Sequence, residues 1–583
     1  MWRPSRLGAA GAVIAVALLL GSCATVPTTG PIREHESGGQ QIETEVKVAP
    51  IPPARGSSPM LIVEGFLHAM GTDQAGFAIA RQYLTAEAAA AWRPDSGTLI
   101  YATGYQPRET DTSTDERPVI TLEAVLTGGI DRRGEYREAS GGHRQEFGLV
   151  RNSAGEWRIS RPPDGLLISR YHFQANYTHL DLHYVDPTGT VLVPDRRYLA
   201  QNVLNPDVAY AMQLAGPGDW LAPAVRRSPW TRSLIERADL LPQGVVVLQL
   251  ASYAVNLTDD QRSILMAELT TTLAALPQVT GVQFSLEGTP LTLPGTSIVT
   301  LTAELFAELA ADRQPGGQLL TVRAGAVYPI QLRVPWSEAA PVAGDLTAPG
   351  AIAARADLAE IAAVDPERTR LAVSVGAEDE LVLAEEQQGL LRPDYSRSNE
   401  LWTIAGDAGA AGFVVYSADD HQPITVSVAE DFPAEPVHAF RLSPDGTRIA
   451  LVLGGPVVDG AMVEQVGIAR ILRKADEIVL EGFRTVTVSP PAEAARSILD
   501  VGWQTPVELL VLVSHRVTAS VIRVDQDSAH AEDIGPAEVA GLREVAVVPG
   551  GTPVLLGGEG VYRFEGPFSW ELTGLEAEAV TYS

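Results

Sequence analysis

The hydrophobic pattern begins with one long apolar run, after which no period is visible for some distance. Every residue from Leu7 to Leu20 is apolar or small, and Arg3 and Arg6 precede the run. A run of this length is too short to span a bilayer comfortably and has the layout of a secretory signal. Residues 23–58 are rich in Pro, Gly, Ser, Thr and charge, and therefore predict a flexible tether.

Helical periodicity starts at Ser58-Pro59, which combine an N-cap residue with a first-turn proline. A hydrophobic face at helical spacing follows, and Gly71 is expected to end the helix. A second helix is predicted from Phe77 to Trp92. Strand patterns then cover residues 119–126, 144–150, 156–159 and 173–185. Helices followed by antiparallel strands indicate an α+β domain over residues 59–185.

The next segment, residues 186–335, alternates helix and strand patterns in α/β order. Asn205-Pro206 predicts a helix start, and Val245 to Leu250 is an apolar run of strand length. Thr258 and Gln261 have the spacing of a capping box and introduce a helix that Pro277 closes. A further strand is expected from Val279 to Leu286.

Beyond Pro335 the pattern changes to short strands separated by polar turns. Turn anchors recur at Pro366, Asp407, Pro444, Pro506 and Pro549, which are 41, 37, 62 and 43 residues apart. These intervals approach the roughly 40 to 50 residues of a propeller blade. Residues 336–583 therefore predict an all-β propeller of five or six blades. A β-sandwich is the alternative, but sandwiches lack a period this long.

The only cysteine changes the interpretation of the first apolar run. Cys23 ends the stretch Leu20-Gly21-Ser22-Cys23, and a single cysteine cannot form an internal disulfide. The stretch resembles the lipobox of bacterial lipoproteins, which implies that residues 1–22 are a signal peptide cleaved between Ser22 and Cys23. It also implies a diacylglyceryl group on the Cys23 sulfur, and two acyl chains hold a protein stably at a membrane. The alternatives are an ordinary secretory signal with an incidental cysteine, and an uncleaved anchor.

Charge restricts the partners of this chain. The 583 residues carry a formal net charge of −29, and removal of residues 1–22 leaves 41 basic against 72 acidic residues, or −31. Such a chain is poorly suited to nucleic acid, which rewards clustered positive charge. An anionic membrane surface would also repel it, so the lipid is expected to hold it there.

Catalytic motifs are scarce. The sequence contains no P-loop, no Gly-x-Ser-x-Gly elbow and no His-Glu-x-x-His. Tyr177, His179, Asp181 and His183 alternate, and on a strand they would share one face that suits zinc. A half-exposed strand face is the favoured interpretation, since strands alternate by default. Asp259-Asp260 and Asp419-Asp420 are interpreted as a helix first turn and a loop. No catalytic residue, cofactor or metal is expected.

The first domain and the segment after it carry a series of short motifs. They are Ile62-Val63, Gly65-Phe66-Leu67, Ala69-Met70, Ala80-Arg81, Tyr83-Leu84-Thr85, Trp92-Arg93-Pro94, Gly155 to Ile159, Pro163-Asp164-Gly165 and Val191 to Asp195. Together these motifs resemble the opening of the LpqB family of actinobacterial lipoproteins. For this domain the resemblance implies a cone-shaped NTF2-like fold. In the second domain, Leu214 to Pro217, Val255 to Thr258 and Val282 to Gly288 resemble the GerMN domain, a protein-interaction module without catalytic residues.

The resemblance to the LpqB family also implies a location and a partner. Members are lipoproteins on the outer face of the cytoplasmic membrane. They bind the extracellular part of the sensor histidine kinase MtrB and modulate signalling in envelope homeostasis and cell division. The alternative function is an envelope ligand-binding sensor or enzyme that uses the propeller channel or the NTF2-like cone.

Overall fold

The computed structural model describes residues 50–583, apart from gaps at 73–74, 111–112, 227, 229, 313–316, 333–339, 343–345, 376–378, 406–411, 455–456, 459–460, 463, 475–476, 489–496, 516–517, 537–538 and 540. The predicted signal peptide, Ser22, Cys23 and most of the tether lie outside the described residues. Within the described ranges, no helix is long and apolar enough to cross a membrane.

The first module opens with helices, as the sequence predicts. Helix α2 (Pro59–Gly71) starts where the Ser58 hydroxyl accepts a hydrogen bond from the Leu61 N–H at 3.3 Å. The single helix predicted from Phe77 to Trp92 is wrong, because the segment forms α3 (Ala78–Gln82) and α4 (Ala86–Ala91). Leu84 leaves the helical path to form a bridge with Ile159, and Thr85 then caps α4.

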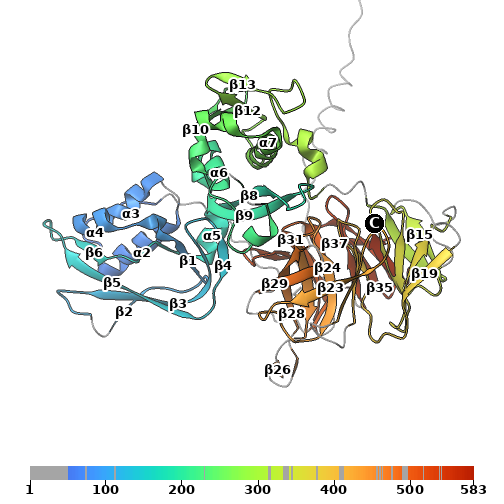
Figure 1. Ribbon diagram of the computed structural model, residues 1–583. Helices are drawn as coiled ribbons and strands as arrows, with labels where there is room; N and C mark the ends of the chain where they lie inside the picture. The colour runs from blue at the N-terminus through green and yellow to red at the C-terminus, as the bar shows by residue number, and fades with distance from the viewer. Residues whose placement is uncertain are drawn as a thin grey trace, which may run out of the picture. The chain divides into compact units, whose positions relative to one another are not determined.

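One curved sheet completes this module. Its order is β6 (Trp157–Arg161), β5 (Gly142–Arg151), β3 (Val119–Ile130), β1 (Thr98–Tyr101) and β7 (Leu166–Ser169), with β2 (Arg108–Glu109) and β4 (Tyr136–Glu138) also paired to β3. Helices α2, α3 and α4 lie on one side of it (Figure 1). The strand predicted from Phe173 starts only at Tyr177, because Ser169 caps the helix α5 (Arg170–Asn176).

The second module is an α/β unit with a separate hairpin. Strands β10 (Ile235–Leu240), β11 (Val245–Leu250), β12 (Gly281–Leu286) and β13 (Thr289–Leu291) form a sheet in that order, and helices α6 (Pro206–Gln213) and α7 (Asp259–Ala274) accompany it. β11 and β12 are parallel because α7 connects them. The predicted capping box of Thr258 and Gln261 is present at the start of α7.

The hairpin consists of β8 (Tyr177–Val185) and β9 (Leu192–Ala200). Leu180, Leu182 and Tyr184 of β8 belong to the hydrophobic core of the second module. The core of this module therefore starts before residue 186, where the sequence pattern placed the boundary. The reason is that β8 alternates outward polar and inward apolar residues, and its inward face packs on α7.

The third module is a β-propeller of six blades within the described residues. The blades are β38-β14-β15 (Ala579–Tyr582, Leu319–Arg323, Ala326–Ile330); β16 to β19 (Ala351–Ala354, Ile361–Val364, Leu371–Val375, Asp379–Ala384); β20 to β23 (Asp394–Tyr395, Leu401–Ile404, Phe413–Tyr416, Pro423–Val428); β24, β25, β28 and β29 (Val437–Leu442, Arg448–Leu453, Gln465–Arg473, Glu477–Val486); β30 to β33 (Ser497–Thr505, Glu508–Ser514, Ala519–Asp525, Ala531–Asp533); and β34 to β37 (Glu544–Ala546, Val554–Gly557, Gly560–Gly566, Ser569–Leu572). The third and fourth blades are joined into one eight-stranded sheet, because β23 pairs in parallel with β29. The small hairpin β26 (Val457–Val458) and β27 (Ala461–Met462) extends from the fourth.

The first strands of these sheets close into a ring. β16, β20, β24, β30, β34 and β38 each contact the next, and β38 contacts β16. β38 also pairs antiparallel with β14, so the C-terminal strand completes the blade that begins at Leu319. The strand pairing thus starts the propeller before residue 336, because β14 and β15 belong to its first blade.

The turn anchors that suggested a repeat are not all in phase. Pro444, Pro506 and Pro549 follow the innermost strand of their sheets, whereas Pro366 follows the second strand of its sheet. Asp407 lies outside the described residues. The interval of 62 residues arises because the fourth sheet carries the extra β26-β27 hairpin.

Candidate functional site

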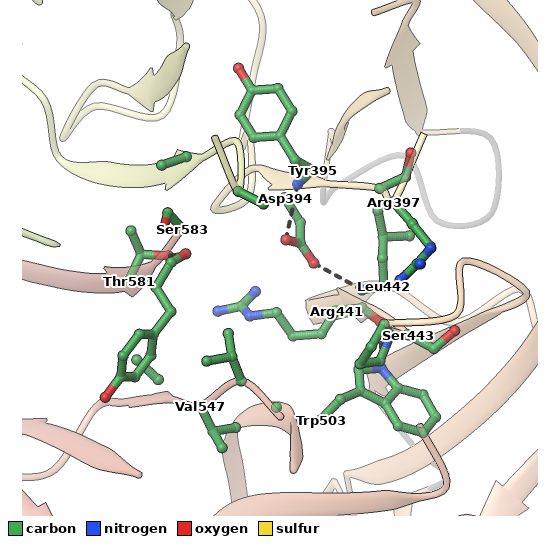
Figure 2. A pocket seen from close by; sticks show the side chains of 18 of the residues that line it. Asp394, Tyr395, Arg397, Arg441, Leu442, Ser443, Trp503, Val547, Thr581 and Ser583 are labelled. Carbon is green, nitrogen blue, oxygen red and sulfur yellow. Dashed lines mark hydrogen bonds between the residues drawn. The ribbon is translucent and has the colours of Figure 1, made fainter. Parts of the chain in front are cut away.

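A channel runs where the six innermost strands of the propeller converge, and it encloses a cavity of about 310 Å³. Its wall includes Ala354 from β16, Asp394 and Tyr395 from β20, Leu442 from β24, Trp503 from β30, Val547 after β34, and Thr581 and Ser583 at the C-terminal strand. These side chains come from segments far apart in the sequence. Figure 2 shows six of them around one space, namely Asp394, Leu442, Trp503, Val547, Thr581 and Ser583.

Two arginines of this channel share one buried carboxylate. Arg392 Nη1 donates to Asp500 Oδ2 at 3.4 Å, and Arg441 Nη2 lies 3.3 Å from Asp500 Oδ1. The Val545 N–H also donates to Asp500 Oδ2 at 3.0 Å. Burial and the nearby Arg441 lower the pKa of Arg392. Asp500 lies on β30. Through charge-assisted hydrogen bonds it links β30 to β24, to β34 and to Arg392, which stands just before β20.

Asp394 and Glu544 are two further buried carboxyl groups beside these arginines. The Asp394 carboxylate accepts from the Leu442 N–H at 2.9 Å and from the Tyr395 N–H at 3.0 Å, as the dashed lines of Figure 2 show. Burial raises the pKa of Asp394 and of Glu544, while Arg441 opposes the rise at Asp394 and Arg392 opposes it at Glu544. Asp394, Glu544 and Asp500 are thus held by the two arginines and by backbone N–H groups.

This arrangement suits a structural or binding role better than group transfer. Among the channel's described residues we find arginines, carboxylates, hydroxyls and aromatic rings, and the carboxylates already accept hydrogen bonds. Sequence reasoning did not single out these residues. A weak signal existed, because Arg441 and Asp500 are charged residues inside otherwise apolar strands, where such residues need partners.

Strand β8 contains Tyr177, His179, Asp181 and His183, the residues considered as a possible zinc site. His179 is exposed, and Asp181 and His183 are half-buried. Asp181 is engaged by Arg196, whose Nε and Nη2 donate to its two oxygens at 2.8 and 3.0 Å. Burial lowers the pKa of His183. Within the described parts of the chain, no group of three His, Cys, Asp or Glu side chains is arranged to hold a metal ion.

The paired aspartates lie where the sequence placed them. Asp259 and Asp260 stand in the first turn of α7, and Asp259 pairs with Arg262. Asp420 belongs to the turn between β22 and β23, where its carboxylate accepts a hydrogen bond from the Ser417 hydroxyl. Asp260 pairs instead with Arg226, whose Nη1 lies 3.5 Å from Asp260 Oδ2.

Strand β9 carries a second cluster of buried charge, which contacts the propeller. Arg448 is 1% exposed, pairs with Asp445, and donates from Nη2 to the Pro194 carbonyl at 2.6 Å. Arg196 Nη1 donates to Asp525 Oδ1 at 2.6 Å. The Tyr198 hydroxyl donates to Asp525 Oδ2 at 2.9 Å. One strand thus joins the hairpin of the second module to two blades.

Asp527 stands next to this cluster and behaves differently from Asp525. Burial and the adjacent Asp525 raise the pKa of Asp527 to about 6. The His530 and Arg196 side chains instead hold the pKa of Asp525 below its usual value against the effect of burial. The two carboxylates therefore titrate as a coupled pair whose lower pKa belongs mainly to Asp525.

Family models match three successive parts of the chain. The model for the N-terminal domain of lipoprotein LpqB matches residues 52–174, and the model for the lipoprotein LpqB beta-propeller domain matches residues 317–571. Between them, residues 181–292 match the sporulation and spore germination domain called Germane. Their order agrees with the three modules of the structure.

Among solved structures, the chain is similar to the nidogen/laminin complex, with a TM-score of 0.33, 8% identity, and coverage of 46% of this chain and 98% of the other. It is also similar to the WD40 beta propeller domain of Doa1, with a TM-score of 0.30, 8% identity, and coverage of 45% and 79%.

Similar sequences extend over the whole length. Lipoprotein LpqB of Thermobifida fusca is 29% identical and covers 95% of each chain. Lipoprotein LpqB of Cutibacterium acnes is 30% identical over 609 aligned positions, with 99% of each chain covered. With three family models in the same order and this similarity along both chains, the protein belongs to the LpqB family of lipoproteins.

Proposed function

We propose that the protein is a membrane-anchored extracytoplasmic lipoprotein that binds and modulates a sensor histidine kinase similar to MtrB. It would act through the kinase's extracellular domain in envelope homeostasis and cell division. The kinase as partner follows from what the resemblance to the LpqB family implies. The family name supports the lipid anchor, which we assign to Cys23 after cleavage behind Ser22.

The observation that supports a binding role is that charged side chains of the propeller channel are already hydrogen-bonded to one another or to the backbone. Arg392 and Arg441 converge on Asp500, and Asp394 accepts two backbone N–H groups. A catalytic carboxylate needs a free oxygen and a reacting proton within reach. These groups instead stabilise the ring of innermost strands, which leaves the outer surface of the modules to serve the function.

The alternative is a ligand-binding sensor or an enzyme that uses the propeller channel or the NTF2-like cone. The specific observation in its favour is the channel cavity of about 310 Å³, which is a size that accepts a small molecule. Fold alone does not license an activity, so we place this alternative second.

Crosslinking in intact cells tests the proposed partner. We expect a photo-crosslinker on the exposed surface of the protein to recover the extracellular domain of a sensor kinase. We also expect deletion of the protein to change phosphorylation of the kinase's response regulator. An unrelated lipoprotein with the same type of anchor is the control. Recovery of no kinase, together with unchanged regulator phosphorylation, would refute the proposal.

A further inference from the structure

The second module contains a cavity of about 200 Å³ that is separate from the propeller channel. Residues of α7 line one side of it, and the described residues Arg226, Ser228 and Trp230 line the other. From α7, Gln261, Ile264 and Glu268 line it at helical spacing, so they form one stripe on the helix. Arg226, Ser228, Trp230 and Asp260 complete the wall.

Glu268 lines this cavity and is only 1% exposed. Its Oε1 accepts a hydrogen bond from the Val185 N–H at 3.1 Å, which holds the side chain in place. Its Oε2 is buried and has no partner at hydrogen-bond geometry among the described residues. The Ser228 hydroxyl favours the charged carboxylate without reaching that geometry. A buried carboxyl oxygen without a partner costs stability unless something fills the position.

The remaining wall combines apolar and charged groups. Trp230 is buried and supplies an aromatic surface, and Ile264 adds an aliphatic one. Arg226 and Asp260 form an ion pair, with Arg226 Nη1 and Asp260 Oδ2 3.5 Å apart. Asp260 balances Arg226, which is the only arginine among the described residues of the wall, so Glu268 sets the net charge of those residues.

We propose that this cavity binds a small alkylammonium group, whose nitrogen occupies the position beside Glu268 Oε2 and whose alkyl part contacts Trp230 and Ile264. A carboxylate and an aromatic face are the two groups that recognise organic cations in proteins. An anionic ligand is disfavoured, because it would place its charge next to the buried acid. The assignment is independent of the kinase as a partner.

The protonation of Glu268 determines how the affinity for an alkylammonium ion changes with pH. Burial raises the pKa of Glu268 to about 8, while Arg226 and the hydrogen bond from Val185 oppose the rise. Asp260 on its own helix and Tyr184 on β8 are the other titratable groups nearby. An ammonium ion requires the charged carboxylate, so its binding releases the Glu268 proton. Affinity must then rise with pH up to about 8.

The test uses the full chain and three probes that share a four-carbon tail, namely n-butylammonium, 1-butanol and butyrate. Chemical shift changes measured by NMR report each affinity. At pH 8 we expect n-butylammonium to bind about tenfold tighter than either other probe. We expect its affinity to rise about tenfold from pH 6 to pH 7 and to level off above pH 8.

Two variants separate recognition from folding. Glu268→Gln keeps an oxygen for the Val185 N–H but removes the charge, so it should lose the preference for n-butylammonium and the pH dependence. Glu304→Gln changes an exposed glutamate of the same module and should bind like the wild type. Equal binding of the three probes, affinity that falls as pH rises, or a cavity that holds water only would each overturn the proposal.

Discussion

At the scale of single residues, several buried charges of this protein are paired with an opposite charge. Arg448 is almost fully buried, contacts Asp445, and donates to the Pro194 carbonyl. A buried pair adds little net stability over an apolar pair, but removal of one partner leaves an uncompensated charge. The cost of such a removal is therefore much larger than the value of the pair.

Arg448→Met is expected to lower the free energy of unfolding of the propeller by about 3 to 5 kcal/mol, because Asp445 loses its partner in a dry environment. Denaturant unfolding followed by tryptophan fluorescence measures the loss. Arg543→Met removes an exposed arginine of the same module and serves as the control. Similar losses of unfolding free energy for the two variants would show that the buried Arg448–Asp445 pair matters no more than an exposed arginine.

The raised pKa of Asp527 predicts that the free energy of unfolding depends on pH. Its folded pKa of about 6 lies above the ordinary value of 3.8, so its contribution to stability is full below about pH 4 and is lost as pH rises to about 6. The difference corresponds to about 2 to 3 kcal/mol. Asp527→Asn should therefore gain stability relative to the wild type between pH 4.5 and pH 7.5, as measured by denaturant unfolding at both values. Asp533→Asn, on an exposed residue, should show a flat difference.

Prediction from the sequence succeeded where the cause is local. Ser58 caps α2 as predicted, and Thr258 forms the predicted capping box with Gln261 at α7, since both are contacts within one helical turn. The channel could not be predicted in this way. Arg392, Arg441 and Asp500 meet only after three blades close, and nothing in their sequence neighbourhood encodes that meeting.

At the scale of elements, long-range pairing decided the points that the sequence missed. The helix predicted across Leu84 breaks because that residue bridges to Ile159, which is far away in the chain. The first blade was missed because β14 finds its partner β38 at the opposite end of the propeller sequence. Hydrophobic period identifies strands, but it does not identify which strands pair.

Closure by β38 can be tested with one substitution. Val580 is fully buried in β38, and its N–H donates to Glu544 Oε2 at 3.3 Å. Val580→Asp places an unpaired charge at the seam, and we expect a loss of about 3 kcal/mol or more, with earlier cleavage in limited proteolysis. Glu576→Gln alters an exposed residue just before the strand and should leave the proteolysis pattern unchanged. Wild-type resistance in Val580→Asp would contradict closure by this strand.

At the scale of the whole molecule, the central question is what holds the protein at the membrane. The chain without residues 1–22 has a net charge of −31, which an anionic membrane surface repels. Two acyl chains on Cys23 would supply the attachment.

Cys23→Ser removes the proposed site of lipid attachment. We expect the variant to appear in the medium or to remain as an uncleaved precursor, because the sulfur that accepts the lipid is gone. Fractionation of cells followed by mass measurement distinguishes these products from the lipidated form. Mature-sized protein that stays in the membrane fraction after the substitution would contradict the assignment of the anchor.

The proposed binding of a sensor kinase at the membrane is tested most directly by a proximity-labelling pull-down. The cells carry either the wild-type protein or Cys23→Ser. We expect the wild type to label a sensor histidine kinase and the labelling to fall strongly in Cys23→Ser, because the partner is reached only from the membrane. Absence of a kinase among the labelled proteins, or equal labelling by the two forms, would contradict the proposal.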